Sequence, residues 1–358
     1  MKKIKYWLFL FKCFKKELKR YSVSFLDSRY FYDVEFTNPN NIFIDESSNV
    51  EKGSVLIVSD PKNHNEKDII IKKFCWIGRN VEIQTHYGSK IIISDYASVQ
   101  DGCKLLGSVS IGKYCILAPD IFISSGNHFF NKQPHLTIRE QDATELSNTT
   151  LFFKNNKKVS INEDCWIGKN VFIKQGVSVG RGAIIGTNSL VDEDVEPYSI
   201  MIGSPAKKIK NRLEFNPPKK LSPFEDELLP YFYSGFEHYI SGKKIQTQIQ
   251  DNKGILSENN SLAVLKQTDW KEIEITGHSI LNGKLAVFID GTLHSQQEIS
   301  ADFVFLININ KLDNNENQLT EYLDLPNYLK KHLCINFIFD SNNTNSFYNF
   351  IISKIQIL

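Results

Sequence analysis

Four histidines lie in the first half of the chain, and three of them, His86, His128 and His135, are candidates for chemistry among polar and turn-forming residues. An imidazole has an unperturbed pKa of about 6.5, so it can take up or release a proton near neutral pH. A positioned base that takes the proton of an attacking hydroxyl contributes roughly 10²–10⁴-fold to a reaction rate. Histidines can also bind metal. What they can do here depends on the elements that hold them.

Those elements follow a six-residue repeat in the first two-thirds of the chain. An aliphatic residue recurs at every sixth position, usually with a small or β-branched residue two positions before it. An α-helix has no period of six, whereas short strands joined by corners in a parallel β-helix do. Three repeats close one triangular coil, which predicts a mainly β prism of about six coils. The aliphatic positions are Ile44, Val50, Leu56, Ile71, Ile77, Ile83, Ile93, Val99, Leu105, Ile111, Leu117, Ile123, Ile161, Ile167, Ile173, Val179, Ile185 and Val191.

The repeat is interrupted three times, after Leu56, Ile83 and Ile123, and each interruption follows the third position of a coil. All three loops should therefore leave the prism at the same edge. The second loop carries His86. The third, residues 124–158, carries His128, two coils or about 10 Å further along the prism. Long loops in compact domains are often functional, although exposed corners also tolerate insertions that have no role.

Four features together resemble the hexapeptide-repeat acyltransferases, most closely the O-acetyltransferases of sugars and bacterial surface polysaccharides. They are the repeats, the loop Gly126-Asn127-His128-Phe129, the segment 164–171 (DCWIGKNV) and the exit 203–207 (GSPAK). The resemblance covers about residues 40–212. It implies a left-handed β-helix, a homotrimer, and acetyl-CoA bound between neighbouring subunits. The left hand rests on the resemblance alone, since ordinary parallel crossovers are right-handed.

The resemblance also assigns roles in the reaction. His128, in the loop with Asn127, becomes the general base of a direct acetyl transfer without an acyl-enzyme, and His86 could touch the acceptor or remain a solvated loop residue. A carboxylate should orient His128, and the sequence does not choose among the candidates. These are Asp120, Glu140, Asp142 and Glu145.

Two tryptophans, Trp76 and Trp166, occupy near-identical segments three coils apart. Each precedes an inward aliphatic residue, so its ring should point outward. Related polysaccharide acetyltransferases use a tryptophan near the coil of Trp166. This favours an active-site role for Trp166, and packing between subunits is the alternative.

The end of the prism is the expected cofactor site. Glycines and serines there allow close backbone approach, and lysines suit the phosphates of coenzyme A. Arg212 is a further cation nearby that could meet the phosphates. The alternative is that these cations only form a solvated cap on the end of the prism. The predicted cofactor-binding residues are Gly186, Ser189, Gly203, Ser204, Lys207 and Lys208.

The two ends of the chain differ from the prism. Residues 1–20 carry eight Lys and Arg against one acid and have apolar residues at helical spacing within a lead-in of residues 1–40. This predicts a basic amphipathic helix that either lies on a membrane surface or packs on the trimer. It is not a convincing signal peptide. Residues 213–262 are expected to be a linker with a short helix near 224–229, and residues 263–358 a β-sandwich-like domain that binds glycan or braces the oligomer.

Composition narrows the function classes. The formal net charge is +1, which gives no global attraction to nucleic acid. Four of six cysteines fall on small positions of the repeat, as expected for buried thiols of a cytoplasmic protein, peripheral to the inner membrane if the first helix binds lipid. They are Cys75, Cys103, Cys115 and Cys165.

Four functions remain open, of which acetyl-CoA-dependent O-acetylation of a surface glycan or its precursor (capsule or lipopolysaccharide) leads. The others are N-acetylation of an amino-sugar nucleotide, a non-catalytic glycan-binding or scaffold role, and a metal-dependent hydratase. The hydratase needs three convergent histidines. All three candidates lie in loops and no histidine of the repeat completes such a set, so we expect no metal.

Overall fold

A computed structural model describes residues 33–59, 61, 63, 66–86, 88–146, 156–237, 239–240, 243–244, 255–308, 319, 325–340 and 350–358. The chain forms two units, Met1–Glu214 and Phe215–Leu358. The basic helix predicted for residues 1–20 lies outside the described residues. In the part of the chain that is described, no helix is long and apolar enough to cross a membrane.

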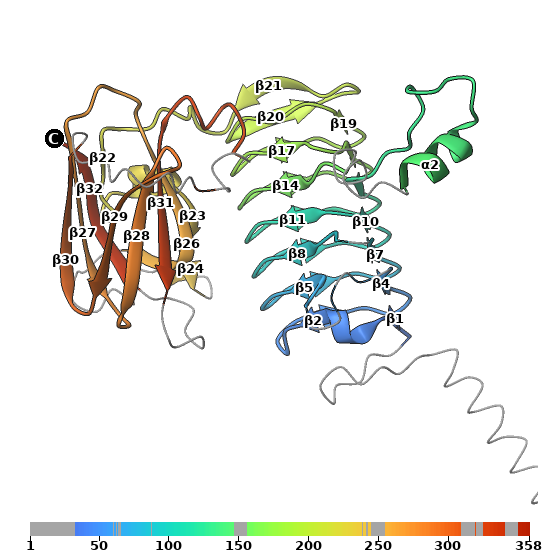
Figure 1. Cartoon of the computed structure of the whole chain (residues 1–358), viewed down its shortest axis with the longest axis horizontal. Helices are drawn as coiled ribbons and strands as arrows, with labels where there is room; N and C mark the ends of the chain where they lie inside the picture. The colour runs from blue at the N-terminus through green and yellow to red at the C-terminus, as the bar shows by residue number, and fades with distance from the viewer. Residues whose placement is uncertain are drawn as a thin grey trace, which may run out of the picture. The chain divides into compact units, whose positions relative to one another are not determined.

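The first unit is a prism with three walls of stacked short strands (Figure 1). The first wall holds β2 (Ile42–Ile44), β5 (Ile69–Ile71), β8 (Ile91–Ile93), β11 (Val109–Ile111), β14 (Val159–Ile161) and β17 (Ser178–Val179). The second wall holds β3 (Asn49–Val50), β6 (Trp76–Ile77), β9 (Ser98–Val99), β12 (Ile116–Leu117), β15 (Trp166–Ile167), β18 (Ile184–Ile185), β20 (Ser199–Ile202) and β21 (Lys207–Asn211). The third wall holds β1 (Glu35–Thr37), β4 (Val55–Val58), β7 (Glu82–Thr85), β10 (Lys104–Leu106), β13 (Phe122–Ser124), β16 (Phe172–Ile173) and β19 (Leu190–Val191).

From β2 to β19 the chain visits the first, second and third walls in strict rotation. Neighbouring strands of a wall pair in parallel, except that β21 returns antiparallel to β20. The repeat keeps one register, so that Ile71 pairs with Ile93 and Ile111 with Ile161. These parallel sheets confirm the predicted mainly β fold, a parallel β-helix.

The inward aliphatic positions form the core of the prism. All of them except the partly buried Val50 are at most 2% exposed. The four cysteines of the repeat are buried between them. Burial raises the pKa of the Cys103 thiol to about 11 and that of Cys75 to about 12. Because the thiolate is the reactive form, burial makes Cys75 and Cys103 poor nucleophiles, and both side chains pack in the core.

The three loops leave the prism between the third and first walls, after β4, β7 and β13. We call this corner the loop edge. It includes Ser59, His86, Ser108, the 124–158 loop and Lys174. The predicted placement of the loops on one edge is therefore correct.

Gly107 makes a tight contact on this edge. Its φ is +87°, and a Cβ there would lie 2.1 Å from Ser125 Oγ, which accepts the N–H of Ser108 at 2.7 Å. We expect Gly107→Ala to lower the free energy of unfolding by at least ~1–2 kcal/mol, the cost of a left-handed backbone for a residue with a Cβ. Denaturant unfolding measures this. A change within about 0.5 kcal/mol, typical of a neutral surface substitution, would contradict the crowding.

The second unit is a nine-stranded antiparallel sheet with a phenylalanine-rich core. Seven strands run in the order β29-β28-β31-β26-β32-β27-β30, and β22 and β23 pair with β32 and β26. The strands are β22 (Lys220–Leu221), β23 (Phe232–Phe236), β26 (Ile255–Leu265), β27 (Glu272–Ser279), β28 (Gly283–Ile289), β29 (Thr292–Ile299), β30 (Asp302–Asn308), β31 (Leu333–Asp340) and β32 (Phe350–Ile357). A 3₁₀ helix, η2 (Asp226–Tyr231), precedes β23, and β24 (Tyr239–Ile240) pairs with β25 (Lys243–Lys244).

This unit corrects the expected linker at residues 213–262. Strands β22, β23 and most of β26 fall inside that range and hydrogen-bond into the sheet. Phe232 and Phe236 are fully buried in its core. Strand β26 pairs with β31 over Asn260–Leu265 and with β32 over Ile255–Ser257, so the strands form one continuous hydrogen-bonded sheet. Phe337 of β31 also packs on Phe350 of β32 with ring centroids 6.1 Å apart, and the β-sandwich-like arrangement stays a prediction.

Candidate active site

His128 is held by a carboxylate from its own loop. Its Nδ1 lies 2.7 Å from Asp142 Oδ2, and the other oxygen of Asp142 accepts the N–H of Phe129 at 2.8 Å. An ionised carboxylate only accepts hydrogen bonds, so in the neutral imidazole Nδ1 carries the proton and Nε2 keeps its lone pair. The His128 side chain is 78% exposed, which leaves Nε2 available to a substrate.

The other three candidate carboxylates are engaged elsewhere. Asp120 pairs with Lys169 at 3.3 Å, and Glu145 pairs with Lys132 at 2.9 Å. Glu140 accepts the backbone N–H and the hydroxyl of Thr137, both at 2.8 Å. The geometry therefore selects Asp142, a choice that the sequence left open.

Asp142 is positioned by α2 (Ile138–Leu146), a helix inside the third loop that the repeat did not predict. Gln141, 3% exposed, ties this helix to the chain before it. Its Oε1 accepts the N–H of Gln133 at 3.2 Å, and its Nε2 donates to the carbonyls of Phe130 and Leu136 at 3.4 and 3.2 Å. The sequence did hold a signal for this helix, because Thr137-x-x-Glu140 is a capping box.

Asn127 and His86 also lie on the loop edge. Asn127 is exposed, and its Oδ1 accepts the N–H of His128 at 3.0 Å. His86 is exposed just after β7, two strands from β13 on the third wall. The structure thus brings Asn127 against His128 and places His86 on the same edge at the predicted separation of two strands.

Trp166 lies on a different wall from these residues. It begins β15 on the second wall, 53% exposed, between Ile116 and Ile184 of the neighbouring strands. Trp76 lies three strands away on the same wall, as predicted. In a triangular prism the second wall is opposite the loop edge, so a single chain does not bring Trp166 to His128.

The predicted cofactor residues gather at the β18–β21 end of the prism. Buried Ser189 donates from Oγ to the carbonyl of Gly186 at 2.7 Å and accepts the N–H of Gly203 at 3.1 Å. The N–H of Gly186 donates to the carbonyl of Met201 at 2.7 Å. Lys207 and Lys208 are exposed on β21, and Lys208 pairs with Glu196 at 2.8 Å. The N–H groups of Gly186 and Gly203 are therefore already used within the prism, and a Cβ on Gly186 would lie 3.1 Å from the Ile202 side chain.

Comparison with known proteins identifies the prism. The family model for bacterial transferase hexapeptide (six repeats) matches residues 158–193. The putative colanic acid biosynthesis acetyltransferase WcaF of Escherichia coli strain K12 is 30% identical over 144 residues, which are 38% of this chain and 70% of that protein. The chain belongs to the hexapeptide-repeat acyltransferase family.

Two further matches are partial. A chloramphenicol acetyltransferase of Klebsiella aerogenes is 37% identical over 108 residues, 28% of this chain and 50% of that protein. The chain thus spans about half the length of this relative. The solved structure of the polySia specific acetyltransferase NeuO is 26% identical and covers 51% of this chain and 71% of that one, with a TM-score of 0.33.

This acyltransferase prism carries charged residues on the edge between its first and second walls, all of them buried except the partly buried Lys73. Successive coils place side chains of alternating charge sign there. The backbone N–H of the residue that follows each charged residue donates a hydrogen bond to the preceding coil. We call this corner the charged edge. Its residues are Lys73, Asp95, Lys113, Glu163 and Arg181.

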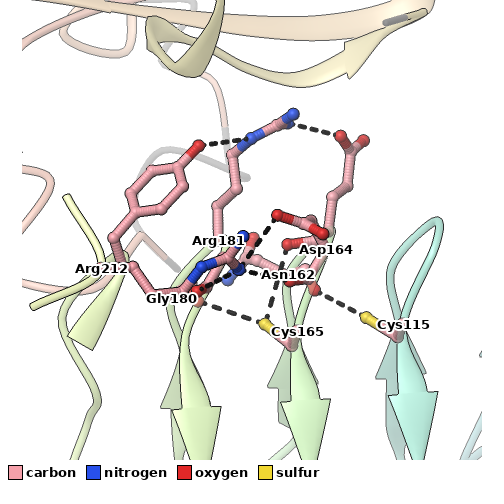
Figure 2. Close-up of polar contacts among 10 residues, drawn as sticks. Cys115, Asn162, Asp164, Cys165, Gly180, Arg181 and Arg212 are labelled. Atoms are coloured by element: carbon pink, nitrogen blue, oxygen red, sulfur yellow. Dashed lines mark hydrogen bonds and ion pairs between the residues drawn. The ribbon is translucent and has the colours of Figure 1, made fainter. Parts of the chain in front are cut away.

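The last pair of the charged edge is a closed ion pair (Figure 2). Arg181 Nη1 lies 2.6 Å from Glu163 Oε2, and Arg181 Nε donates to the Tyr198 hydroxyl at 3.2 Å. Burial disfavours the charged guanidinium, but Glu163 and Tyr198 outweigh this and raise the pKa of Arg181. The network is therefore structural.

Arg212 directly follows β21, and its side chain contacts residues next to this ion pair (Figure 2). Its Nη1 donates to the carbonyl of Gly182 at 2.8 Å and to Asp164 Oδ2 at 3.2 Å. These contacts bind Arg212 to the prism and make it a weaker candidate for coenzyme A phosphates than the sequence indicated. Among the described residues, no group of three His, Cys, Asp or Glu side chains could hold a metal ion.

Proposed function

We propose that this chain is an acetyl-CoA-dependent O-acetyltransferase that modifies a sugar hydroxyl of a bacterial surface glycan or its precursor. The observation that carries the proposal is the pairing of exposed His128 with Asp142 at 2.7 Å on the loop edge of an acyltransferase prism. The relative named for colanic acid biosynthesis supports a polysaccharide acceptor.

The geometry of His128 suits a direct transfer. Nε2 takes the proton of the acceptor hydroxyl as the hydroxyl oxygen attacks the thioester carbonyl of acetyl-CoA. The tetrahedral intermediate collapses with loss of the coenzyme A sulfur, which receives the proton from Nε2. Asp142 holds the required tautomer and stabilises the imidazolium between the two steps. A backbone N–H should meet the charge on the thioester oxygen.

The outward faces of the prism support a trimer that completes the site. Ile116 and Trp166 are about half exposed on the second wall, and Phe122 stacks on Phe172 on the third wall with ring centroids 5.2 Å apart. The first wall presents serines at the same height. Two apolar walls and one polar wall suit a closed ring of copies, in which the third wall of one packs on the second wall of the next. A trimer of such left-handed β-helices would bring Trp166 of one copy towards His128 of another.

In this assembly acetyl-CoA would lie along the second wall. Its phosphates would meet Lys207 and Lys208 on β21, and Gly186, Ser189, Gly203 and Ser204 would line its approach. Asn127 would hold the turn of His128, and His86 would contact the acceptor. These assignments extend the roles predicted from the sequence. They also add an apolar contact for the cofactor, the outward side chains of Trp166 on β15 and Ile184 on β18.

The proposal is tested by incubating the full chain with acetyl-CoA and a panel of bacterial capsule and lipopolysaccharide glycans. We expect release of coenzyme A that depends on the glycan, and an acetyl product that mild alkali removes, as it removes esters. An alkali-stable acetyl group on an amino sugar would replace the proposal with N-acetylation. Absence of acetyl-CoA binding would reject the enzyme reading and favour a scaffold.

Asp142 is proposed as a positioning residue, and Asp142→Asn tests it. The amide can donate to Nδ1 and thereby favour the tautomer with a proton on Nε2, which cannot act as base. We expect kcat to fall, though by less than on removing His128, with a changed pH–rate profile and an unchanged melting temperature. The matched control is Glu140→Gln, which alters the start of α2 without touching His128. Equal losses of kcat in both variants would assign Asp142 a merely structural role.

A further inference from the structure

Exposed lysines follow the loop edge on both sides of the His128 loop. They are Lys90, Lys157, Lys158 and Lys174. Lys90 and Lys158 directly precede β8 and β14, which lie two strands apart on the first wall with β11 between them. Lys174 directly follows β16, at the level of β17. The row therefore spans three strand spacings, or about 14 Å.

Lys157 connects this row to the root of the His128 loop. Its N–H donates to the carbonyl of Ser125 at 3.1 Å, and its own carbonyl accepts the N–H of Gly176 at 3.0 Å. A Cβ on Gly176 would lie 3.1 Å from the Lys157 side chain, which shows that the lysine stem rests over this glycine. One lysine of the row is thus hydrogen-bonded to the first turn of the loop that carries the proposed base.

Apart from the acidic segment 192–194 at its end, the carboxylates near the row are buried or engaged with other groups. Within the described ranges, none of the four lysines has a salt bridge. Asp142 holds His128, and Glu145 holds Lys132. Asp68, which feels the charge of Lys90, is buried, and desolvation raises the pKa of its carboxyl.

The row ends at an acidic segment. Residues 192–194 (DED) follow β19, one strand beyond β16, and all three are exposed. The positive charge is therefore confined to the levels that flank His128. Within one chain, the lysines proposed for the coenzyme A phosphates lie at β21 on the second wall, which is not the wall pair that forms the loop edge.

We propose that the loop edge binds an anionic saccharide, a glycan that carries carboxylates or phosphates on successive units and passes His128. The inference rests on the proposed function and narrows its acceptor to acidic polymers or oligomers. A single exposed ion pair contributes little, about 0–1 kcal/mol. Recognition therefore needs several lysines together and should weaken as salt screens them.

The test uses the full chain and the triple variant Lys157→Gln, Lys158→Gln, Lys174→Gln. The matched control, Lys266→Gln, Lys271→Gln, Lys284→Gln, removes three exposed lysines from the second unit. Fluorescence anisotropy measures binding of labelled oligogalacturonate, phosphorylated mannan oligosaccharide and neutral dextran oligosaccharide, without acetyl-CoA. Comparing the first two probes distinguishes a carboxylate source from a phosphate source.

We expect the triple variant to weaken binding of at least one acidic probe about tenfold, as three modest ion pairs would. The triple variant should keep its dextran binding and its KM for acetyl-CoA, and the control variant should bind the acidic probes as the wild type does. Salt should weaken binding of the acidic probes by the wild type. Equal loss in the control variant, or a rise in the KM for acetyl-CoA instead, would overturn the proposal, as would acidic and neutral probes binding alike. Lysine-dependent acidic binding without acetyl transfer would keep this site and reject the enzyme function.

Discussion

Replacement of His128 by alanine is expected to lower kcat for acetyl transfer by roughly 10²–10⁴-fold, the usual contribution of a positioned general base. Nε2 is the atom lost, and among the described residues no other histidine forms a hydrogen bond or ion pair with Asp142. Because the side chain is 78% exposed, unfolding should change by no more than about 0.5 kcal/mol. Steady-state kinetics with acetyl-CoA and the acceptor identified from the glycan panel measure the effect.

The matched controls are two other exposed histidines of the same edge. His135→Ala changes the same loop and His86→Ala the neighbouring one. His135→Ala should keep kcat, and His86→Ala should raise the KM for the acceptor more than it lowers kcat. A His128→Ala enzyme with wild-type kcat would remove His128 from the mechanism while leaving the enzyme class intact.

Replacement of Glu163 by alanine is expected to lower the free energy of unfolding by about 3–5 kcal/mol, the usual effect of breaking a buried ion pair on one side. Both side chains of the Glu163–Arg181 pair are 8% exposed, and their atoms lie 2.6 Å apart. Without Glu163, Arg181 would remain a buried charge with no carboxylate partner, because an arginine does not release its proton in a protein. Denaturant unfolding at fixed protein concentration measures the change.

The double variant Glu163→Leu, Arg181→Met serves as its control. It removes both charges and keeps apolar volume, so it should recover much of the stability lost in Glu163→Ala. A Glu163→Ala protein within about 1 kcal/mol of wild type, the range of an exposed pair, would contradict the picture of a closed buried pair on the charged edge.

The prism could be predicted because its repeat has one physical solution. An aliphatic residue at every sixth position needs an inward strand position, and Cys75 or Cys165 two residues earlier needs a buried corner. The same phase predicted the outward ring of Trp166 and the common edge of the loops. The partner of His128 could not be predicted, because α2 lies outside the repeat and four carboxylates lie within 17 residues of His128 in the sequence.

The second unit shows where pattern reading failed. Strand β26 carries the polar run Glu258-Asn259-Asn260 in its middle, which interrupts any alternation of apolar and polar residues. Strand β23 contains Gly235 at a φ of +73°, beside a register shift against β26. Both segments resemble a linker locally, and only pairing with distant strands makes them part of the sheet.

The most direct test of the central claim is mass spectrometry of both the glycan and the protein after a single turnover with acetyl-CoA. If His128 acts as a base in direct transfer, the glycan gains an alkali-labile acetyl group while the protein mass stays unchanged, and His128→Ala leaves the glycan unacetylated in the same time. An acetylated protein, or a glycan acetylated equally well by His128→Ala, would contradict the account.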